Sequence, residues 1–245
     1  MTTTYSDAQA AALYDVLNPW GPEDEFYLGL VLDVGAVLDV GCGTGRLLQR
    51  ARDAGHSGRL CGIDPDPAML EVARNRADVE WLDGAAASIP FLAVFDLAVM
   101  TGHAFQCLVE DDDVRQSLEA IRAALVEDGR FAFETRNPLA RAWEGWHGSS
   151  FDALDPTGAP VRISYDVESV VDDVVTFTET TSAADGTPLR VDRASLRFLA
   201  FDELDTYLGA AGFDVEARYG GWAGEPFDPE SREIVTVARR ARRLA

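Results

Sequence analysis

The sequence predicts an α/β fold in which a doubly wound, mostly parallel sheet carries a small antiparallel β insertion. Three observations favour this class. Short apolar runs alternate with helix-like stretches from residue 36 onward, and the first of these runs leads directly into a glycine-rich bend at residues 41–45. A different pattern, in which polar and apolar residues alternate, begins after residue 148. Apolar strands that alternate with helices are typical of a parallel sheet covered on both faces.

The composition indicates one large soluble domain. The chain has 245 residues, of which 47% are hydrophobic, and that is enough to bury a sizeable core. No apolar run approaches the roughly 20 residues that cross a bilayer. The first residues lack the basic and apolar segments of a secretory signal. We therefore expect a cytoplasmic protein.

The formal net charge of −21 limits the partners that the protein can bind. Such an acidic surface repels phosphate backbones and anionic lipids, so we expect no nucleic-acid partner and no membrane partner. Solubility alone would also explain the acidity.

Several classes of chemistry are excluded by residue types that are missing. All 21 basic residues are arginine, which excludes a Schiff-base enzyme and a P-loop NTPase, since both need a lysine. The cysteines form no CxxC pair and the three histidines are scattered. His103 and Cys107 stand four residues apart without further ligands nearby, so we expect neither a metal site nor a disulfide framework.

The first 30 residues are predicted to be helical and are rich in aromatic side chains. Prolines after Asn18 and Gly21 divide them into two pieces, because proline interrupts a helix. We expect this segment to fold over the site as a lid, with Tyr14 and Trp20 in contact with cofactor or substrate. Ordinary packing is the alternative for both side chains.

Strands and helices then alternate through the central part of the chain. Strands are predicted at 37–40, 60–63, 79–82, 95–100 and 131–133, and helices at 46–54, 68–76 and 113–126. In the insertion, strands are predicted at 162–170, 174–182 and 189–199, followed by a helix at 203–211 and strands at 215–219 and 233–238. No linker separates these parts, so we expect one domain over 1–245: a lid (1–30), a cofactor-binding core (36–147), the β insertion (148–200) and a segment that completes the sheet (201–245).

The glycine bend is the most informative segment of the sequence. A buried strand runs into Gly41, Gly43 and Gly45, and a helix opens at Arg46. Glycines there let the backbone turn tightly and let a ligand lie against it. A dinucleotide-binding loop of the form GxGxxG would place its third glycine at position 46. The bend therefore predicts a nucleoside ligand without a diphosphate.

An acidic residue follows at the end of the second predicted strand. Asp64 lies 23 residues beyond Gly41, where its carboxylate can accept hydrogen bonds from both hydroxyls of a ribose. The alternative is that Asp64 only caps the helix ahead of Pro65.

On these residues the chain resembles the class I S-adenosylmethionine (SAM)-dependent methyltransferases, from about residue 30 to 238. The resemblance implies a Rossmann-like sheet of seven strands whose last strand is antiparallel, with SAM as the cofactor and S-adenosylhomocysteine (SAH) as the product. The cofactor-binding residues that we expect are Asp39, Gly41, Cys42, Gly43, Gly45, Arg46, Asp64, Pro65, Met69, Asp83, Gly84, Ala85 and Thr101.

One position departs from the family pattern. Met69 corresponds to the apolar residue that packs on adenine, but the aspartate expected five residues before Pro90 is replaced by Ala85. Adenine is then read either by Asp83 or by the backbone of Gly84 and Ala85.

The candidate catalytic and substrate-binding residues follow the fourth and fifth predicted strands, because ligands lie at the carboxyl edge of such sheets. We expect His103 to act as a base, since an imidazole exchanges a proton near neutral pH; the alternative is that it only hydrogen-bonds the loop. Glu134 is the second candidate and could bind a cationic substrate. Arg136, Asn137 and Arg141 are candidate substrate contacts, and either arginine could bind a carboxylate. A structural role is the alternative for each.

The sequence therefore predicts an enzyme that transfers a methyl group from SAM to a small molecule, with nitrogen favoured over oxygen as the acceptor atom. The lid and the inserted sheet resemble those of N-methyltransferases that act on amino sugars or glycine. The alternative is a non-catalytic protein that binds SAM or SAH as a regulator or assembly partner. An NAD(P) oxidoreductase is disfavoured by Arg46. The β insertion could form a homodimer surface.

Overall fold

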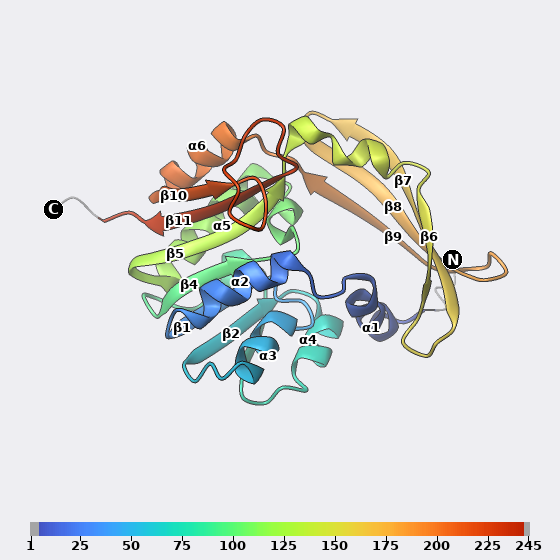
Figure 1. Cartoon of the computed structure of the whole chain (residues 1–245), viewed down its shortest axis with the longest axis horizontal. Helices are drawn as coiled ribbons and strands as arrows, with labels where there is room; N and C mark the ends of the chain where they lie inside the picture. Colours follow the sequence, from blue (N-terminus) through green and yellow to red (C-terminus); the bar gives the residue numbers. More distant parts are fainter. Residues whose placement is uncertain (1–4, 243–245) are drawn as a thin grey trace.

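The computed structural model describes residues 5–242, and Figure 1 shows how they are arranged. The helices are α1 (Asp7–Leu17), α2 (Pro22–Leu32), α3 (Arg46–Asp53), α4 (Pro67–Ala73), α5 (Asp111–Ala124) and α6 (Phe201–Ala211), with 3-10 turns η1 (Ala86–Ser88), η2 (Ala104–Cys107), η3 (Pro138–Ala140) and η4 (Ala142–Gly145). Residues 1–4 of the predicted lid and 243–245 of the predicted completing segment lie outside the described residues.

A seven-stranded main sheet forms the centre of the molecule. Its strands are β1 (Ala36–Val40), β2 (Arg59–Asp64), β3 (Glu80–Asp83), β4 (Phe95–Met100), β5 (Leu125–Arg136), β10 (Phe213–Tyr219) and β11 (Glu233–Arg240), in the order β10-β11-β5-β4-β1-β2-β3. All pairings are parallel except those of β11, which runs antiparallel to β5 and β10. This arrangement confirms the predicted fold class and its antiparallel last strand.

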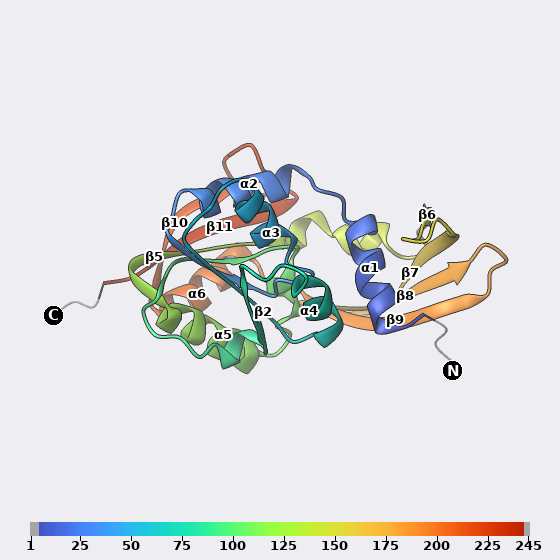
Figure 2. The same cartoon turned by 90° about the horizontal axis from the view of Figure 1, so that it is seen from below.

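Helices cover both faces of this sheet, as the apolar strands require. On one face, α2 and α3 pack through Val31 and Leu48. On the other, α5 and α6 pack through Leu118 and Leu204, and Figure 2 shows α2 and α5 on opposite sides of the sheet. None of the helices in the described part of the chain is both long enough and apolar enough to cross a bilayer.

A second, antiparallel sheet is inserted between β5 and α6, as the sequence predicts. It consists of β6 (Ser150–Leu154), β7 (Pro160–Val171), β8 (Val174–Ala183) and β9 (Pro188–Arg197) in sequential order, and we call it the cap sheet. Helix α1 lies between the cap sheet and the core (Figure 2), where Leu13 packs with Val161 and Ile163 of β7. The helix that the sequence predicts as a lid is therefore held from two sides.

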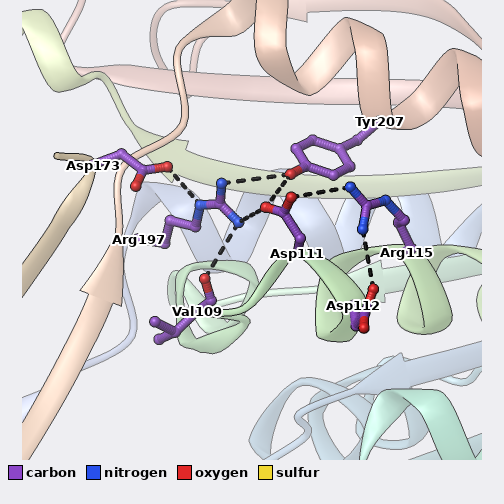
Figure 3. Close-up of polar contacts among 7 residues, drawn as sticks. All are labelled: Val109, Asp111, Asp112, Arg115, Asp173, Arg197 and Tyr207. Atoms are coloured by element: carbon purple, nitrogen blue, oxygen red, sulfur yellow. Dashed lines mark hydrogen bonds and ion pairs between the residues drawn. The ribbon is translucent and has the colours of Figure 1, made fainter.

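The end of β9 is joined to the core by a network of ionic hydrogen bonds (Figure 3). The guanidinium of Arg197 donates to Asp173 at 2.5 Å, to Asp111 at 2.8 Å and to the carbonyl of Val109 at 3.3 Å. The hydroxyl of Tyr207, on α6, donates to the same Asp111 at 2.6 Å. One arginine thus links the cap sheet to the start of α5 and, through Tyr207, to the middle of α6.

The predicted boundary between the fifth strand and its preceding helix is wrong. Helix α5 ends at Ala124 instead of residue 126, and β5 begins at Leu125 instead of 131. Leu125 pairs with Phe95 of β4, and the strand then bulges around Asp128, which has φ of 61°. Pairing with β4 overrides the helical spacing of the apolar side chains, which the sequence pattern alone cannot reveal.

Strand β6 is not predicted by the sequence. It is an edge strand of five residues, and four of its side chains, including Phe151 and Leu154, are exposed. A strand without a buried face gives no alternation of polar and apolar residues, so only its pairing with β7 identifies it.

Candidate functional site

The glycine bend lies where the strand order reverses between β1 and β4. The backbone amides of Gly41 and Cys42 donate to the carbonyl of Ile63 at 2.8 and 3.2 Å, which fixes the bend against β2. Gly43 has φ of 54°, and a Cβ added there would meet nothing within 4 Å. Gly45 has φ of 77° and lies so close to the ring of Trp81 that a Cβ would approach to 2.2 Å. Gly41 also has a positive φ, of 72°. The bend therefore favours glycine at all three positions, and Gly43 leaves open space beside its backbone.

Asp64 lies directly across from this bend, as the sequence predicts. Its carboxylate accepts hydrogen bonds from the amide of Gly43 at 2.7 Å and from the amide of Asp66 at 2.8 Å. The helix cap of α4 is Asp66, whose side chain accepts from the amide of Ala68 at 2.8 Å. The alternative role of Asp64 as the helix cap is therefore wrong. Burial raises the pKa of the Asp64 carboxyl.

The residues predicted for adenine gather beside Asp64. Asp83 is its partner in the β2–β3 ladder, and the amide of Gly84 donates to its carbonyl at 3.0 Å. Ala85 directly precedes η1, and Met69 lies in the first turn of α4, just beyond Pro65. These residues share one end of the sheet, so an adenine held there would lie next to a ribose held by Asp64.

A cavity of about 530 Å³ opens beside the glycine bend, and we call it the main cavity. It is enclosed by the bend, by the α1–α2 segment and by the ends of β4 and β5. The predicted residues that line it are Tyr14, Trp20, Asp39, Gly41, Cys42, Gly43, Arg46, Thr101, His103, Glu134 and Arg136. It is also lined by Asp15, Glu23, Asp24, Tyr27, Trp222 and Glu233, which the sequence analysis did not single out. Its volume is in the range of small-molecule sites.

Asp39 carries a buried polar atom without a partner in this cavity. The residue is 1% exposed, and its Oδ1 has no hydrogen-bond partner among the described residues. Burial, together with the nearby carboxylates of Asp64 and Glu134, raises the pKa of Asp39 to about 8. A carboxyl group in this state would be stabilised by a cation entering the cavity.

These features fit SAM. The open backbone at Gly43 leaves room for its amino-acid portion, the carboxylate of Asp64 suits its ribose, and the orphaned oxygen of Asp39 suits its ammonium group. When bound, SAM supplies a methyl group on a sulfonium, an already activated carbon.

The two predicted catalytic residues are in direct contact. Glu134 is 1% exposed; its carboxylate accepts a hydrogen bond from the backbone amide of His103 at 2.7 Å and another from the hydroxyl of Tyr27. Burial raises the pKa of Glu134, and burial beside Glu134 raises that of Tyr27 well above its usual value. The imidazole Nε2 of His103 lies 2.9 Å from the carboxylate of Glu233. The imidazole of His103 therefore has a carboxylate partner, Glu233, in the wall of the cavity.

The predicted lid is attached to the glycine bend. The hydroxyl of Thr44 donates to Asp15 of α1 at 2.8 Å. The guanidinium of Arg46 donates to the carbonyl of Asn18 and lies 3.5 Å from Asp24 of α2. It also lies over the ring of Trp20. Arg46 thus replaces a glycine of the dinucleotide pattern with a side chain that binds the lid.

The structure separates the three residues predicted after the fifth strand. Arg136 lines the main cavity. Asn137 is 2% exposed and donates to the carbonyls of Pro229 and Ser231. Arg141 is exposed and pairs with Glu144 at 3.2 Å. The structure does not bring Asn137 or Arg141 to the cavity.

A second cavity, of about 400 Å³, lies between α1 and the cap sheet, and we call it the cap cavity. Both cavities are lined by Tyr14, Leu17, Asn18, Gly102 and Arg136. The cap cavity is also lined by Met69 on α4, by Asp66, which caps that helix, and by Glu179 on β8. Because the two cavities adjoin, a ligand in one can reach a ligand in the other.

Comparisons with known proteins agree with this geometry. A family model described as a methyltransferase domain matches residues 37–129. The cypemycin N-terminal methyltransferase of Streptomyces sp is 28% identical over 223 residues, 85% of this chain and 84% of that protein. The 2-phytyl-1,4-naphtoquinone methyltransferase of Thermosynechococcus vestitus is 35% identical over 140 residues, but the match covers only 50% of this chain and 59% of that protein.

Among solved structures, a similar fold is found in SAM-bound CalS10, an amino pentose methyltransferase from Micromonospora echinaspora. The TM-score is 0.70 with 22% identity, over 98% of this chain and 99% of that one. At this identity the likeness concerns the fold alone.

Proposed function

Because the chain is a class I SAM-dependent methyltransferase, we propose that it transfers the methyl group of SAM to a nitrogen atom of a small-molecule acceptor. The observation that carries the proposal is the charge of the main cavity. Acidic side chains dominate its lining, namely Asp15, Glu23, Asp24, Asp39, Glu134 and Glu233, against the guanidinium groups of Arg46 and Arg136.

This charge favours a cationic acceptor. An amine enters as an ammonium ion at neutral pH, whereas an alcohol enters without charge. The ammonium gains from the ionised carboxylates of the lining, and its entry would favour ionisation of Asp39, whose pKa is raised. The low-dielectric cavity strengthens the attraction. The sulfonium and ammonium groups of SAM carry two positive charges, and its carboxylate cancels one of them. SAM therefore neutralises only part of the negative charge of the lining, and the remainder is available to the acceptor.

Two of the similar proteins have names that support the same choice. The name of the cypemycin relative refers to an amino terminus, and CalS10 is named for an amino pentose. The naphtoquinone methyltransferase matches only about half of this chain, so its acceptor carries little weight for the acceptor of this protein.

The chemistry needs the acceptor nitrogen to lose a proton before it reacts. In our proposal, the pair of His103 and Glu233 takes that proton, since the imidazole Nε2 and the carboxylate already share a contact of 2.9 Å. The freed lone pair attacks the methyl carbon, the carbon–sulfur bond breaks with its electrons on sulfur, and SAH and the methylated amine result. Glu134 positions His103 and Tyr27 through its two hydrogen bonds. Orientation and exclusion of water supply the rest of the rate.

The test uses the purified chain with SAM and a panel of small amines, each paired with the alcohol of the same carbon skeleton. Mass spectrometry detects products heavier by one CH2 unit, together with SAH. We expect amines to be methylated and their alcohols to be left unchanged. His103→Gln should lower kcat for the amine by about 100-fold or more, the usual contribution of a general base, while SAH still binds.

Two outcomes contradict the proposal. Methylation of the alcohols alone would make the protein an O-methyltransferase. Tight binding of SAH without turnover of any acceptor in the panel or in a metabolite extract would favour a non-catalytic SAM-binding protein.

A further inference from the structure

Arg136 is a cation without an ion-pair partner among the described residues, in a cavity whose lining is mostly acidic. It lies at the end of β5, is partly buried, and lines both the main cavity and the cap cavity. Among the described residues, no carboxylate lies within salt-bridge distance of its guanidinium. By contrast, the side chains of Arg190, Arg197 and Arg218 are at most 20% exposed, and each pairs with an aspartate.

The guanidinium is nevertheless held in place. Its Nη1 donates to the side-chain oxygen of Gln106 at 3.0 Å, and its Cζ lies 5.2 Å from the ring centroid of Trp146. Gln106 is itself 1% exposed and donates to the carbonyl of Arg197 at 3.0 Å. A rigid, partly desolvated guanidinium with N–H groups left over is suited to bind a planar anion through two parallel hydrogen bonds.

Arg136 lies close to the carboxylates that we expect to surround the acceptor's nitrogen. Glu134 and Arg136 are two residues apart on β5, so their side chains leave the same face of the strand, roughly 7 Å apart. Burial lowers the pKa of Arg136, while the carboxylates of Glu233 and Glu134 act to raise it. Opposite charges therefore stand close together on one wall, where the two cavities join.

We propose that the acceptor is an amino acid or a similar compound in which a carboxylate lies close to the amine, and that Arg136 binds the carboxylate. This rests on the proposed N-methyltransferase function and adds the substrate class. With the carboxylate on Arg136, the ammonium lies toward Glu134, Glu233 and His103, where its proton is removed. A simple amine would leave the guanidinium without an anion in a partly desolvated site, which costs free energy.

The experiment compares amino acids with their carboxamides, which keep the amine and lose the negative charge. Glycine, sarcosine, β-alanine and the protein amino acids are each paired with the amide. We expect the best amino acid to exceed its amide by at least about 30-fold in kcat/KM, as for a charge-assisted bidentate pair. Arg136→Gln should raise KM for the amino acid until the two differ by less than about threefold, and Arg136→Lys should restore part of the difference.

Binding measurements distinguish the acceptor's carboxylate from that of SAM. We compare SAH with 5′-methylthioadenosine, which lacks the amino-acid portion. We expect Arg136→Gln to bind both as the wild type does. If the variant binds SAH weakly but 5′-methylthioadenosine normally, the anion is the cofactor's and our proposal is wrong. Arg162→Gln, which removes an exposed arginine paired with Asp152 on the cap sheet, controls for loss of one charge.

Titration of amino acids into the SAH complex separates this proposal from the proposed function. Binding that depends on Arg136 supports the carboxylate site even if no methylation occurs, in which case only the proposed function fails. Amides that bind and react as well as the amino acids, with no effect of Arg136→Gln, would overturn the carboxylate site and leave N-methylation standing. A thermal melt of each variant shows that it is folded.

Discussion

At the scale of single residues, Asp39 has an environment that costs free energy in the absence of a ligand. Its carboxyl is buried with one oxygen unpaired, and its pKa is raised from 3.8 to about 8. Between pH 3.8 and about pH 8, the Asp39 carboxyl keeps its proton in the folded protein and loses it in the unfolded chain. Raising the pH through this window therefore favours unfolding, and the stabilisation that is present below about pH 4 is lost as pH passes 8.

We predict that Asp39→Asn removes this dependence, because an amide does not titrate there. Urea unfolding of both proteins at pH 5, 6, 7 and 8 measures it. The free energy of unfolding of the variant minus that of the wild type should rise with pH, by up to about 1.4 kcal/mol per pH unit. Curves that stay parallel over the whole range would show that Asp39 is already ionised in the folded protein.

The candidate residues differ in how well a sequence can predict them. Gly41 to Gly45 and Asp64 were predicted because a bend after a buried strand and an acid after the next strand are local patterns. Glu233 was missed because it meets His103 across 130 residues, and Tyr27 because its aromatic side chain resembles ordinary packing. The sequence does hold a signal for each residue: Glu233 is the first residue of a predicted strand, and Tyr27 belongs to the predicted lid.

At the scale of elements, the sequence also fails to predict the direction that short turns give to the chain. Arg136, Asn137 and Arg141 follow one strand, and the sequence treats them alike. The 3-10 turns η3 and η4 then direct the chain away from the cavity, so that Asn137 caps η3 and Arg141 reaches the surface. Strand periodicity can predict where a strand ends, but it does not fix the direction of the loop that follows.

The joint between the cap sheet and the core yields a prediction at this scale. The side chain of Arg197 is 12% exposed and binds Asp173 and Asp111 (Figure 3). Arg197→Gln leaves Asp173 without its cation, while Asp111 keeps Arg115 and Tyr207, so we expect the free energy of unfolding to fall by about 2 kcal/mol. Chemical denaturation measures the loss. Hydrogen exchange should also speed up in β8 and β9 more than in β1 and β4.

A neighbouring arginine provides the control. Arg193 lies on the same strand, but it is 66% exposed and pairs with Glu168 at the surface. Arg193→Gln should cost less than about 1 kcal/mol, the usual range for an exposed pair. Equal losses in the two variants would mean that the network of Arg197 does not hold the cap sheet to the core.

At the scale of the whole molecule, the main sheet, the lid and the cap sheet meet around one pair of cavities. The fold class was predictable because strands of a parallel sheet are apolar on both faces, and the insertion because its strands alternate. The sequence predicts that α1 belongs to a lid, but it does not predict that α1 packs between the core and the cap sheet. The contacts of α1 with β7 and α4 depend on tertiary structure.

This arrangement predicts that the cofactor stabilises the molecule as a unit. SAH binds the folded chain and not the unfolded one, so at a concentration 100 times its Kd it adds about 2.7 kcal/mol. For a chain of this size that raises Tm by roughly 5–10 °C. Asp64→Asn should lose most of the increase, because Asp64 is the proposed ribose acceptor, whereas Asp113→Asn, which changes an exposed residue of α5, should keep it. NAD should give no increase, since Arg46 occupies the position of the glycine that a diphosphate needs.

Differential scanning fluorimetry of the three proteins with each ligand measures these shifts in Tm. An equal shift with NAD, or a full shift in Asp64→Asn, would mean that the bend at residues 41–45 and the carboxylate of Asp64 do not bind an adenosyl group together.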